Sequence, residues 1–334
     1  MPQNGLKDVV EETQLLLKEN SKWKELYAGY AKGILSKLVL IRSIRSTFRE
    51  WSPLKLYLTT TNAKSAKNSV TFELRYMGQT TAILKAHKNN QHIISTKGYD
   101  VTNQRDFECN IELENDNWHG EKAREFRSFF KWRRGPRKTG GRKRNDEHRL
   151  ESLLLTEFSK TRRKDKALLN IQPVKIGGAR FAMPTPISAS DHKEIKLGRN
   201  KGGGIDILAR TGIGGRATYL CIMELKDENN KSEPPQDAIK QALAYTTFIR
   251  ELLRSDSGSV WWRLFGFSGN IPQPLTLYAA CVMPSNINND YSFRGETLEI
   301  DGDLIKLHYL YFTTEDDGKI SIKADDTSLS LASK

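Results

Sequence analysis

The sequence predicts two domains: an N-terminal α+β domain, and a C-terminal α/β domain with a mixed central sheet flanked by helices. The chain has 334 residues, which is long enough for two hydrophobic cores. The basic, glycine-rich run "KWRRGPRKTGGRKR" (131–144) is the best candidate for a boundary between them. Beyond it, strand-like residues 218–226, helix-like residues 233–255 and strand-like residues 274–284 follow one another. A crossover of that length implies a parallel strand pair inside a mixed sheet.

The N-terminal domain is predicted to cover residues 1–133. Helical apolar spacing predicts one helix over residues 6–20 and another over residues 22–51. Residues 69–100 are typical of three strands with tight turns between them, and residues 121–134 return to a helical pattern. No residue pattern in this domain indicates a particular chemistry.

The C-terminal domain is predicted to cover residues 146–323, after a basic flexible linker at 134–145 and before a loose tail at 324–334. An amphipathic helix at 145–160 is followed by strand-like segments, a helix, a strand and further terminal strands, which gives the core order αβββαβ. The strand-like segments before the second helix are residues 170–184, 204–210 and 218–226. The polar stretch "SASDHKEIKLGRNKGG" (188–203) is interpreted as a loop.

Charge favours an anionic partner, with DNA the first candidate. The net charge is +13, and residues 121–166 hold 17 Lys or Arg against 7 Asp or Glu. The densest run is interpreted as a flexible arm that binds phosphates, and a solubilising linker is the alternative. Its candidate contacts to nucleic acid are Arg133, Arg134, Arg137, Lys138, Arg142, Lys143 and Arg144.

No apolar run is long enough to span a bilayer, so no membrane partner is expected. The three cysteines are far apart, and no Cys/His spacing indicates zinc. A cytoplasmic location is the expectation.

Charged residues lie inside two segments that otherwise read as buried strands. In a strand, residues i and i+2 point to the same side, so Glu224 and Lys226 share a face. A hairpin can bring Asp206 beside Glu224. Two neighbouring buried carboxylates are unfavourable unless a cation compensates them. One lysine neutralises only one of them, whereas a divalent ion such as Mg²⁺, which prefers oxygen ligands, would satisfy both.

The tripeptide acid-x-Lys alone is weak evidence, because the chain contains it four times, beginning at residues 191, 194, 224 and 317. The copy at 224 is distinguished by its place at the end of a buried strand, after a Gly-Ile-Asp on the neighbouring strand and before a helix. A structural ion cluster is the alternative interpretation.

These residues resemble the PD-(D/E)xK nuclease superfamily, which has the restriction-endonuclease-like fold. The matching elements are Gly204-Ile205-Asp206, Glu224-Leu225-Lys226 and the segment Gln241 to Tyr245, which is similar to the Gln-x-x-x-Tyr element of the RecB-like and phage-exonuclease-like branches. The resemblance covers roughly residues 145–285. The proline that usually precedes the first acid is absent, since Ile205 stands there.

The resemblance implies a metal-dependent phosphodiester hydrolase. Asp206, Glu224, the Leu225 carbonyl and a glutamate of the first core helix would hold Mg²⁺ or Mn²⁺. Glu151 is the first candidate for that glutamate and Glu147 the second. Lys226 would orient the attacking water or stabilise developing charge. Gln241 and Tyr245, one helical turn apart, would position the nucleic-acid backbone or brace Lys226, and an ordinary packed helix is the alternative.

Two-domain nucleases of this kind resemble restriction or phage-defence effectors, in which the extra domain senses a trigger, a protein partner or a second copy. The rival hypotheses are a catalytically inactive nucleic-acid-binding protein on the same fold, a regulatory subunit that docks on another protein, and an RNA nuclease. Trp261 and Trp262 could stack on bases, but packing is the favoured interpretation.

Overall fold

The computed structural model describes residues 3–47, 53–60, 67–89, 91–96, 107, 109–132, 146–159, 170–191, 194–198, 203–212, 218–227, 233–286, 289–314, 320–322 and 329. The chain forms two compact units. Unit 1 comprises Met1–Ala28, Leu153–Val174 and Ala182–Lys334, and unit 2 comprises Gly29–Ser152 and Lys175–Phe181. No helix within the described ranges combines the length and the apolar composition needed to cross a membrane.

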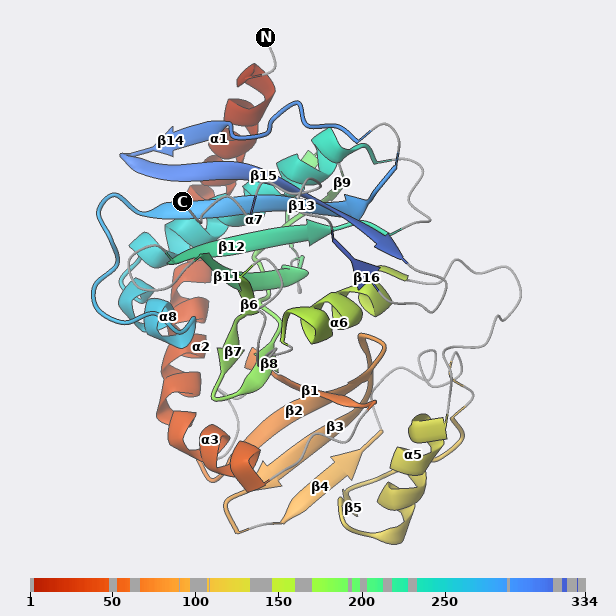
Figure 1. The fold of residues 1–334 in the computed structure, drawn as a ribbon. Helices are drawn as coiled ribbons and strands as arrows, with labels where there is room; N and C mark the ends of the chain where they lie inside the picture. The colour runs from red at the N-terminus through yellow and green to blue at the C-terminus, as the bar shows by residue number, and fades with distance from the viewer. Residues whose placement is uncertain are drawn as a thin grey trace. The chain divides into compact units, whose positions relative to one another are not determined.

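Unit 1 is built on a mixed sheet with the strand order β14-β15-β13-β12-β11-β6, and β16 pairs with the end of β15 (Figure 1). Its strands are β6 (Ile171–Pro173), β11 (Ile207–Gly212), β12 (Thr218–Leu225), β13 (Thr276–Pro284), β14 (Thr297–Ile300), β15 (Asp303–Thr314) and β16 (Ile320–Ser321). The pairs β12–β13 and β13–β15 are parallel, and the others are antiparallel. The predicted parallel pair inside a mixed sheet is therefore confirmed.

Helix α7 (Pro235–Arg254) is the crossover between β12 and β13 and packs on both strands. Its middle and its second half are buried on every side, because helix α1 (Gln3–Glu19) packs against it as well. Trp23, at the start of helix α2 (Lys22–Ser36), meets Phe248 of α7 edge-to-face at 5.6 Å. Burial of these large rings adds apolar contact that ties the N-terminal helices to the C-terminal sheet.

This packing decides which part of the chain belongs to which unit. The sequence placed residues 1–133 in one domain, whereas the first 28 residues belong to the unit of the C-terminal sheet. The apolar stripe of α1 is visible in the sequence, but the helix that covers it lies more than 200 residues away. The predicted linker at 134–145 lies outside the described residues.

Unit 2 contains the second large sheet, with the order β5-β4-β3-β2-β1-β8-β7. Its strands are β1 (Lys55–Leu58), β2 (Ser69–Tyr76), β3 (Gln79–His87), β4 (His92–Ser95), β5 (Asp116–Asn117), β7 (Lys175–Ile176) and β8 (Ala179–Phe181). Helices α3 (Leu38–Thr47) and α5 (Glu121–Trp132) pack on it, and Tyr76, Phe126 and Phe130 form an aromatic core. The three strands predicted in residues 69–100 are β2, β3 and β4.

Three predicted elements differ from the structure. The helix expected over 22–51 breaks at Lys37, between α2 and α3. The strand-like segment 170–184 contributes β6 to one sheet and β7–β8 to the other. The stretch interpreted as a loop forms the antiparallel hairpin of β9 (Ile187–Asp191) and β10 (Glu194–Leu197). That hairpin buries Ile187, Ala189 and Ile195, so the sparse alternation of apolar residues was sufficient for a strand pair.

Candidate active site

The sheet of unit 1 brings Asp206, Glu224 and Lys226 to one place. Ile207 pairs with Met223 in the antiparallel β11–β12 ladder, so Asp206 comes opposite Glu224. The Asp206 Oδ2 atom accepts a hydrogen bond from the Leu225 N–H at 2.9 Å. Residues opposite each other in such a ladder project to the same face. The predicted hairpin therefore places both acids at the same end of the strand pair.

Lys226 is the centre of the cluster. It follows β12 directly, and its N–H donates to the carbonyl of Val282 on β13, which fixes its backbone. Its Nζ atom lies 3.2 Å from Glu224 Oε1 and 3.0 Å from Gln241 Oε1. The side chain is 6% exposed, so these contacts act in a partly water-excluded setting.

Glu233 is a member of the cluster that the sequence analysis missed. One of its carboxylate oxygens lies 2.9 Å from Lys226 Nζ, and the other accepts a hydrogen bond from Gln241 Nε2 at 3.0 Å. It directly precedes Pro234 and Pro235, which begin α7. An acidic residue before a proline-marked helix start is favoured by the helix dipole, so the sequence indicated an acid at the start of α7 but not its contact with Lys226.

Gln241 and Tyr245 of α7 have different surroundings. Gln241 is 2% exposed and braces Lys226, as the contact distances above show. The Tyr245 hydroxyl accepts a hydrogen bond from the Ala189 N–H of β9 at 3.2 Å. A Cβ atom on Gly203 would lie 2.6 Å from that hydroxyl, so a glycine is needed there. In this structure Tyr245 ties α7 to the β9–β10 hairpin.

Glu151 belongs to unit 2, where it joins a buried polar cluster. It lies on helix α6 (Asp146–Phe158), and its Oε1 atom accepts a long hydrogen bond of 3.5 Å from the Tyr57 hydroxyl. Its Oε2 atom lies 3.7 Å from Nδ1 of His148. The guanidinium of Arg75 covers the Tyr57 ring at 4.2 Å. Burial and the Glu151 carboxylate raise the pKa of Tyr57 to about 12. That Glu151 also reaches the metal stays a prediction.

The cluster in unit 1 has the donor set that Mg²⁺ prefers. Glu224 and Glu233 contact the single ammonium of Lys226, and Asp206 is held next to them on the Leu225 N–H, so the formal charges of the four side chains sum to −2. Within the described residues, no three His, Cys, Asp or Glu side chains form a ready-made metal site. Mg²⁺ in phosphate chemistry commonly takes only one or two carboxylates, with water and substrate oxygens completing its shell. Asp206 and Glu224 fit that requirement.

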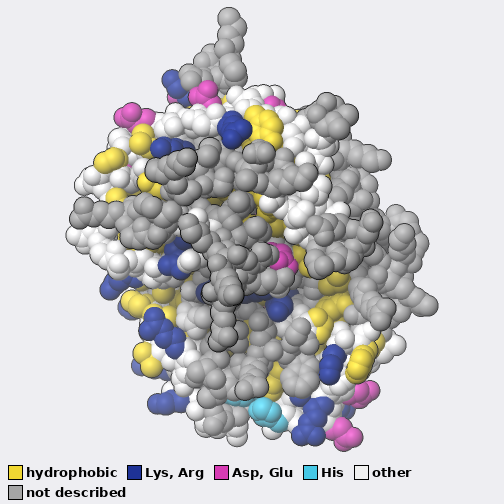
Figure 2. Space-filling model, viewed as in Figure 1, with side chains coloured by type: hydrophobic (Ala, Val, Ile, Leu, Met, Phe, Trp, Pro, Cys, Tyr) yellow, Lys and Arg dark blue, Asp and Glu magenta, His cyan; other side chains and the backbone are white. Residues whose placement is uncertain are grey.

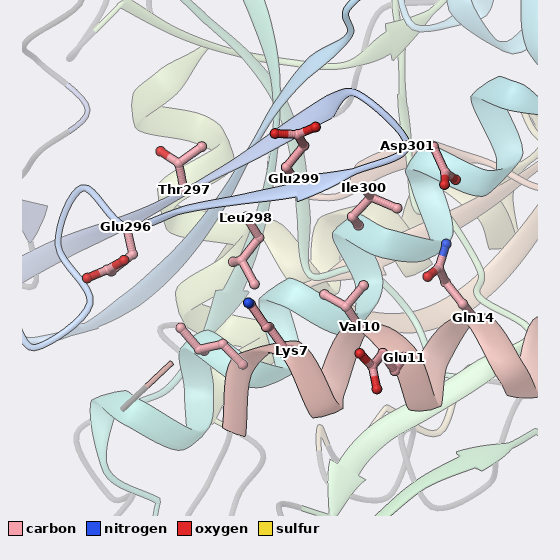
Figure 3. A pocket seen from close by; sticks show the side chains of 11 residues that line it. Lys7, Val10, Glu11, Gln14, Glu296, Thr297, Leu298, Glu299, Ile300 and Asp301 are labelled. Atoms are coloured by element: carbon pink, nitrogen blue, oxygen red, sulfur yellow. The ribbon is translucent and has the colours of Figure 1, made fainter. Parts of the chain in front are cut away.

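A groove beside the N-terminal helix does not belong to this cluster. It has a volume of about 480 Å³ and lies between α1 and the edge strand β14. In Figure 3, Val10, Leu298 and Ile300 form its apolar floor, with Glu11, Glu296 and Asp301 near it, while the Glu299 side chain points to the other side of the strand. Among the described residues of that lining, Lys7 is the one cation. A rim of this charge repels a phosphate backbone, so this groove is not a candidate for binding nucleic acid.

The seven predicted phosphate contacts in the basic run, from Arg133 to Arg144, lie outside the described residues. Comparisons of the chain with protein-family models, with curated proteins and with solved structures found no match.

Proposed function

We propose that the chain is a Mg²⁺-dependent nuclease that hydrolyses DNA phosphodiester bonds, and that unit 1 is a variant of the restriction-endonuclease-like fold. The observation that supports this most directly is Lys226, held between Glu224 and Gln241 at the end of β12, beside Asp206. Buried ion clusters contribute little net stability, so a group of this composition is better explained by chemistry than by folding.

In this proposal Asp206 and Glu224 would hold Mg²⁺, which would supply Lewis acidity toward a phosphate oxygen and the attacking water. The Leu225 N–H keeps the Asp206 carboxylate in place. Gln241 and Glu233 hold the Lys226 ammonium, which orients the water or stabilises charge on the phosphate oxygens. The water oxygen attacks phosphorus, the ester P–O bond breaks, and the proton that the water loses is balanced by protonation of the leaving oxygen from solvent.

In this proposal, positively charged side chains supply affinity for the DNA backbone that does not depend on the base sequence. Lys and Arg side chains recur across the face shown in Figure 2, and few Asp or Glu side chains lie among them. Trp132 ends α5, is the second residue of the basic run 131–144 and is 77% exposed, so its ring is available to stack on a base. Binding through such groups weakens steeply as salt increases.

A second candidate function is nucleic-acid binding without catalysis. The ammonium of Lys226 has three N–H donors, and Glu224, Glu233 and Gln241 supply three acceptors. A lysine satisfied in this way can be purely structural. This candidate predicts DNA binding that needs no Mg²⁺ and no cutting of DNA at any Mg²⁺ concentration.

The decisive experiment incubates closed-circular and linear DNA with the protein and Mg²⁺ or Mn²⁺, and compares the parent with Asp206→Asn and Lys226→Ala. The proposal expects cleavage that both substitutions abolish while binding, measured by fluorescence anisotropy, persists. Nicking of closed circles would establish endonuclease action. Equal cleavage by all three proteins would contradict the proposal, and binding without cleavage by the parent would favour the second candidate. RNA of the same sequence tests the choice of substrate.

A further inference from the structure

A second groove lies at the opposite end of β11 from Asp206. Asp206 precedes this strand, whereas Arg210, Thr211 and Gly212 end it, so the two places are about 15 Å apart along an extended strand. The groove has a volume of about 820 Å³. Its walls are formed by Asn170, Gln172, Arg210, Thr211, Gly212, Thr218, Trp262, Gly266, Phe267, Ser268, Gly269, Asn270 and Pro272.

Among the described residues of the lining one side chain is charged, and it is positive. Arg210 donates to the Gly266 carbonyl at 2.7 Å and to Gln172 Oε1 at 3.2 Å, both of which are neutral acceptors. Within the described parts of the chain, no carboxylate lies at ion-pair distance from Arg210. Burial lowers the pKa of Arg210, and no neighbouring negative charge offsets that effect. The groove therefore presents an uncompensated guanidinium.

Three polar atoms of the lining are buried without a hydrogen-bond partner among the described residues: Arg210 Nε, Thr211 Oγ1 and Trp262 Nε1. Thr211 is 1% exposed and Trp262 is 5% exposed. Each buried polar atom without a hydrogen bond lowers the stability of the folded state by about 1–3 kcal/mol, and native proteins contain few such atoms. These atoms are closed to water as well, so they lie behind the groove wall, and the polar group that faces the groove is the remainder of the Arg210 guanidinium.

An aromatic surface and a glycine complete the groove. Phe267 stacks on Trp262 with ring centroids 3.9 Å apart and planes 12° apart, and Phe267 is half-buried. Gly266 has φ +90°, and a Cβ atom there would lie 2.8 Å from Arg210 Nη1. The glycine thus lets the loop approach the guanidinium closely while the adjacent Phe267 supplies a flat apolar surface.

We propose that this groove binds a nucleotide, with the phosphate at Arg210 and the base against Phe267. An anion alone would use only the guanidinium, and an apolar ligand alone would leave the charge of Arg210 without a partner. A nucleotide combines a planar ring with a phosphate, and the groove is large enough to hold one. The site is separate from the Asp206 cluster, so it stands whether or not the chain cleaves DNA.

Isothermal titration calorimetry of the full chain in EDTA tests the proposal, because EDTA removes metal-dependent binding at the Asp206 cluster. The probes are the four ribonucleoside monophosphates, inorganic phosphate and adenosine. At least one monophosphate is expected to bind more tightly than phosphate or adenosine. Arg210→Gln is expected to weaken it about 10- to 100-fold, because a charge-assisted hydrogen bond is lost.

Phe267→Leu is the second variant and removes the flat surface without touching the charge. It is expected to weaken the monophosphate and adenosine while leaving phosphate unchanged. Arg263→Gln is the matched control, since Arg263 is exposed on helix α8 (Gly258–Leu264) and lies outside the groove lining. Thermal melting shows whether each variant is folded. Failure of every monophosphate to bind in the millimolar range, or equal affinity in the parent, Arg210→Gln and Phe267→Leu, would overturn the proposal.

Discussion

Addition of Mg²⁺ to the metal-free protein is expected to stabilise unit 1 through the Asp206 cluster. Three carboxylates and one ammonium leave a charge of −2, which a divalent cation neutralises. At a Mg²⁺ concentration 100 times its dissociation constant, binding to the folded state alone adds about 2.7 kcal/mol to the free energy of unfolding. For a unit of this size that corresponds to a rise in Tm of roughly 5–10 °C.

The variant Asp206→Asn separates specific binding from a general salt effect. Loss of one carboxylate ligand is expected to raise the dissociation constant at least as much as loss of a supporting contact, about 10- to 100-fold. At the same Mg²⁺ concentration the gain then falls to about 0.4–1.4 kcal/mol. Glu299→Gln is the control, because Glu299 is an exposed acid on β14. Differential scanning calorimetry in matched ionic strength measures all three proteins. If Mg²⁺ raised the Tm of the parent and of Asp206→Asn equally, or left the Tm of the parent unchanged, the reasoning would be refuted.

Three further outcomes are expected. Glu233→Gln removes one carboxylate from Lys226, so the rate constant of DNA cleavage should fall about 10-fold with unchanged KM; an unaltered rate would exclude a positioning role. Asp303→Asn removes the buried carboxylate that Arg250 and Arg254 share and should lower the free energy of unfolding in urea by about 3 kcal/mol; a loss below about 1 kcal/mol would contradict this. Burial and nearby positive charges lower the pKa of His308 to about 4. The unfolded state therefore binds more protons between pH 4 and 6.5, so the free energy of unfolding should rise with pH across that range by up to about 3 kcal/mol. His308→Gln should remove this rise, and an unchanged slope would count against the assignment.

The residue pattern within a single segment was sufficient to predict the type and approximate bounds of several helices and strands. The β11–β12 hairpin, α7 and β13 were predicted within a few residues of their observed bounds, because their apolar periodicity and their proline and glycine boundaries are strong. The parallel pairing of β12 with β13 followed from the length of the crossover between them. The same reasoning placed Asp206 opposite Glu224, since the ladder of a hairpin is set by its turn and its apolar faces.

Contacts between segments far apart in the sequence could not be predicted from local residue patterns. Nothing local indicates that α1 packs on α7, or that residues 175–181 leave the sheet that β6 joins and pair with β1. Both depend on which distant surface an apolar face covers. The sequence likewise left Glu233 out of the site, because its contact with Lys226 depends on how α7 docks on the end of β12.

By itself the sequence determined the composition of the candidate site: an acid before one strand, an acid and a lysine ending the next, and a glutamine on the following helix. Strand alternation and hairpin geometry are short-range, so they act through neighbouring residues only. The tertiary structure decided how these groups are held, with Lys226 bound by Glu233 and Gln241, and it created the Arg210 groove from segments about 100 residues apart. Such sites arise from the packing of separate elements, and packing is a property of the whole fold.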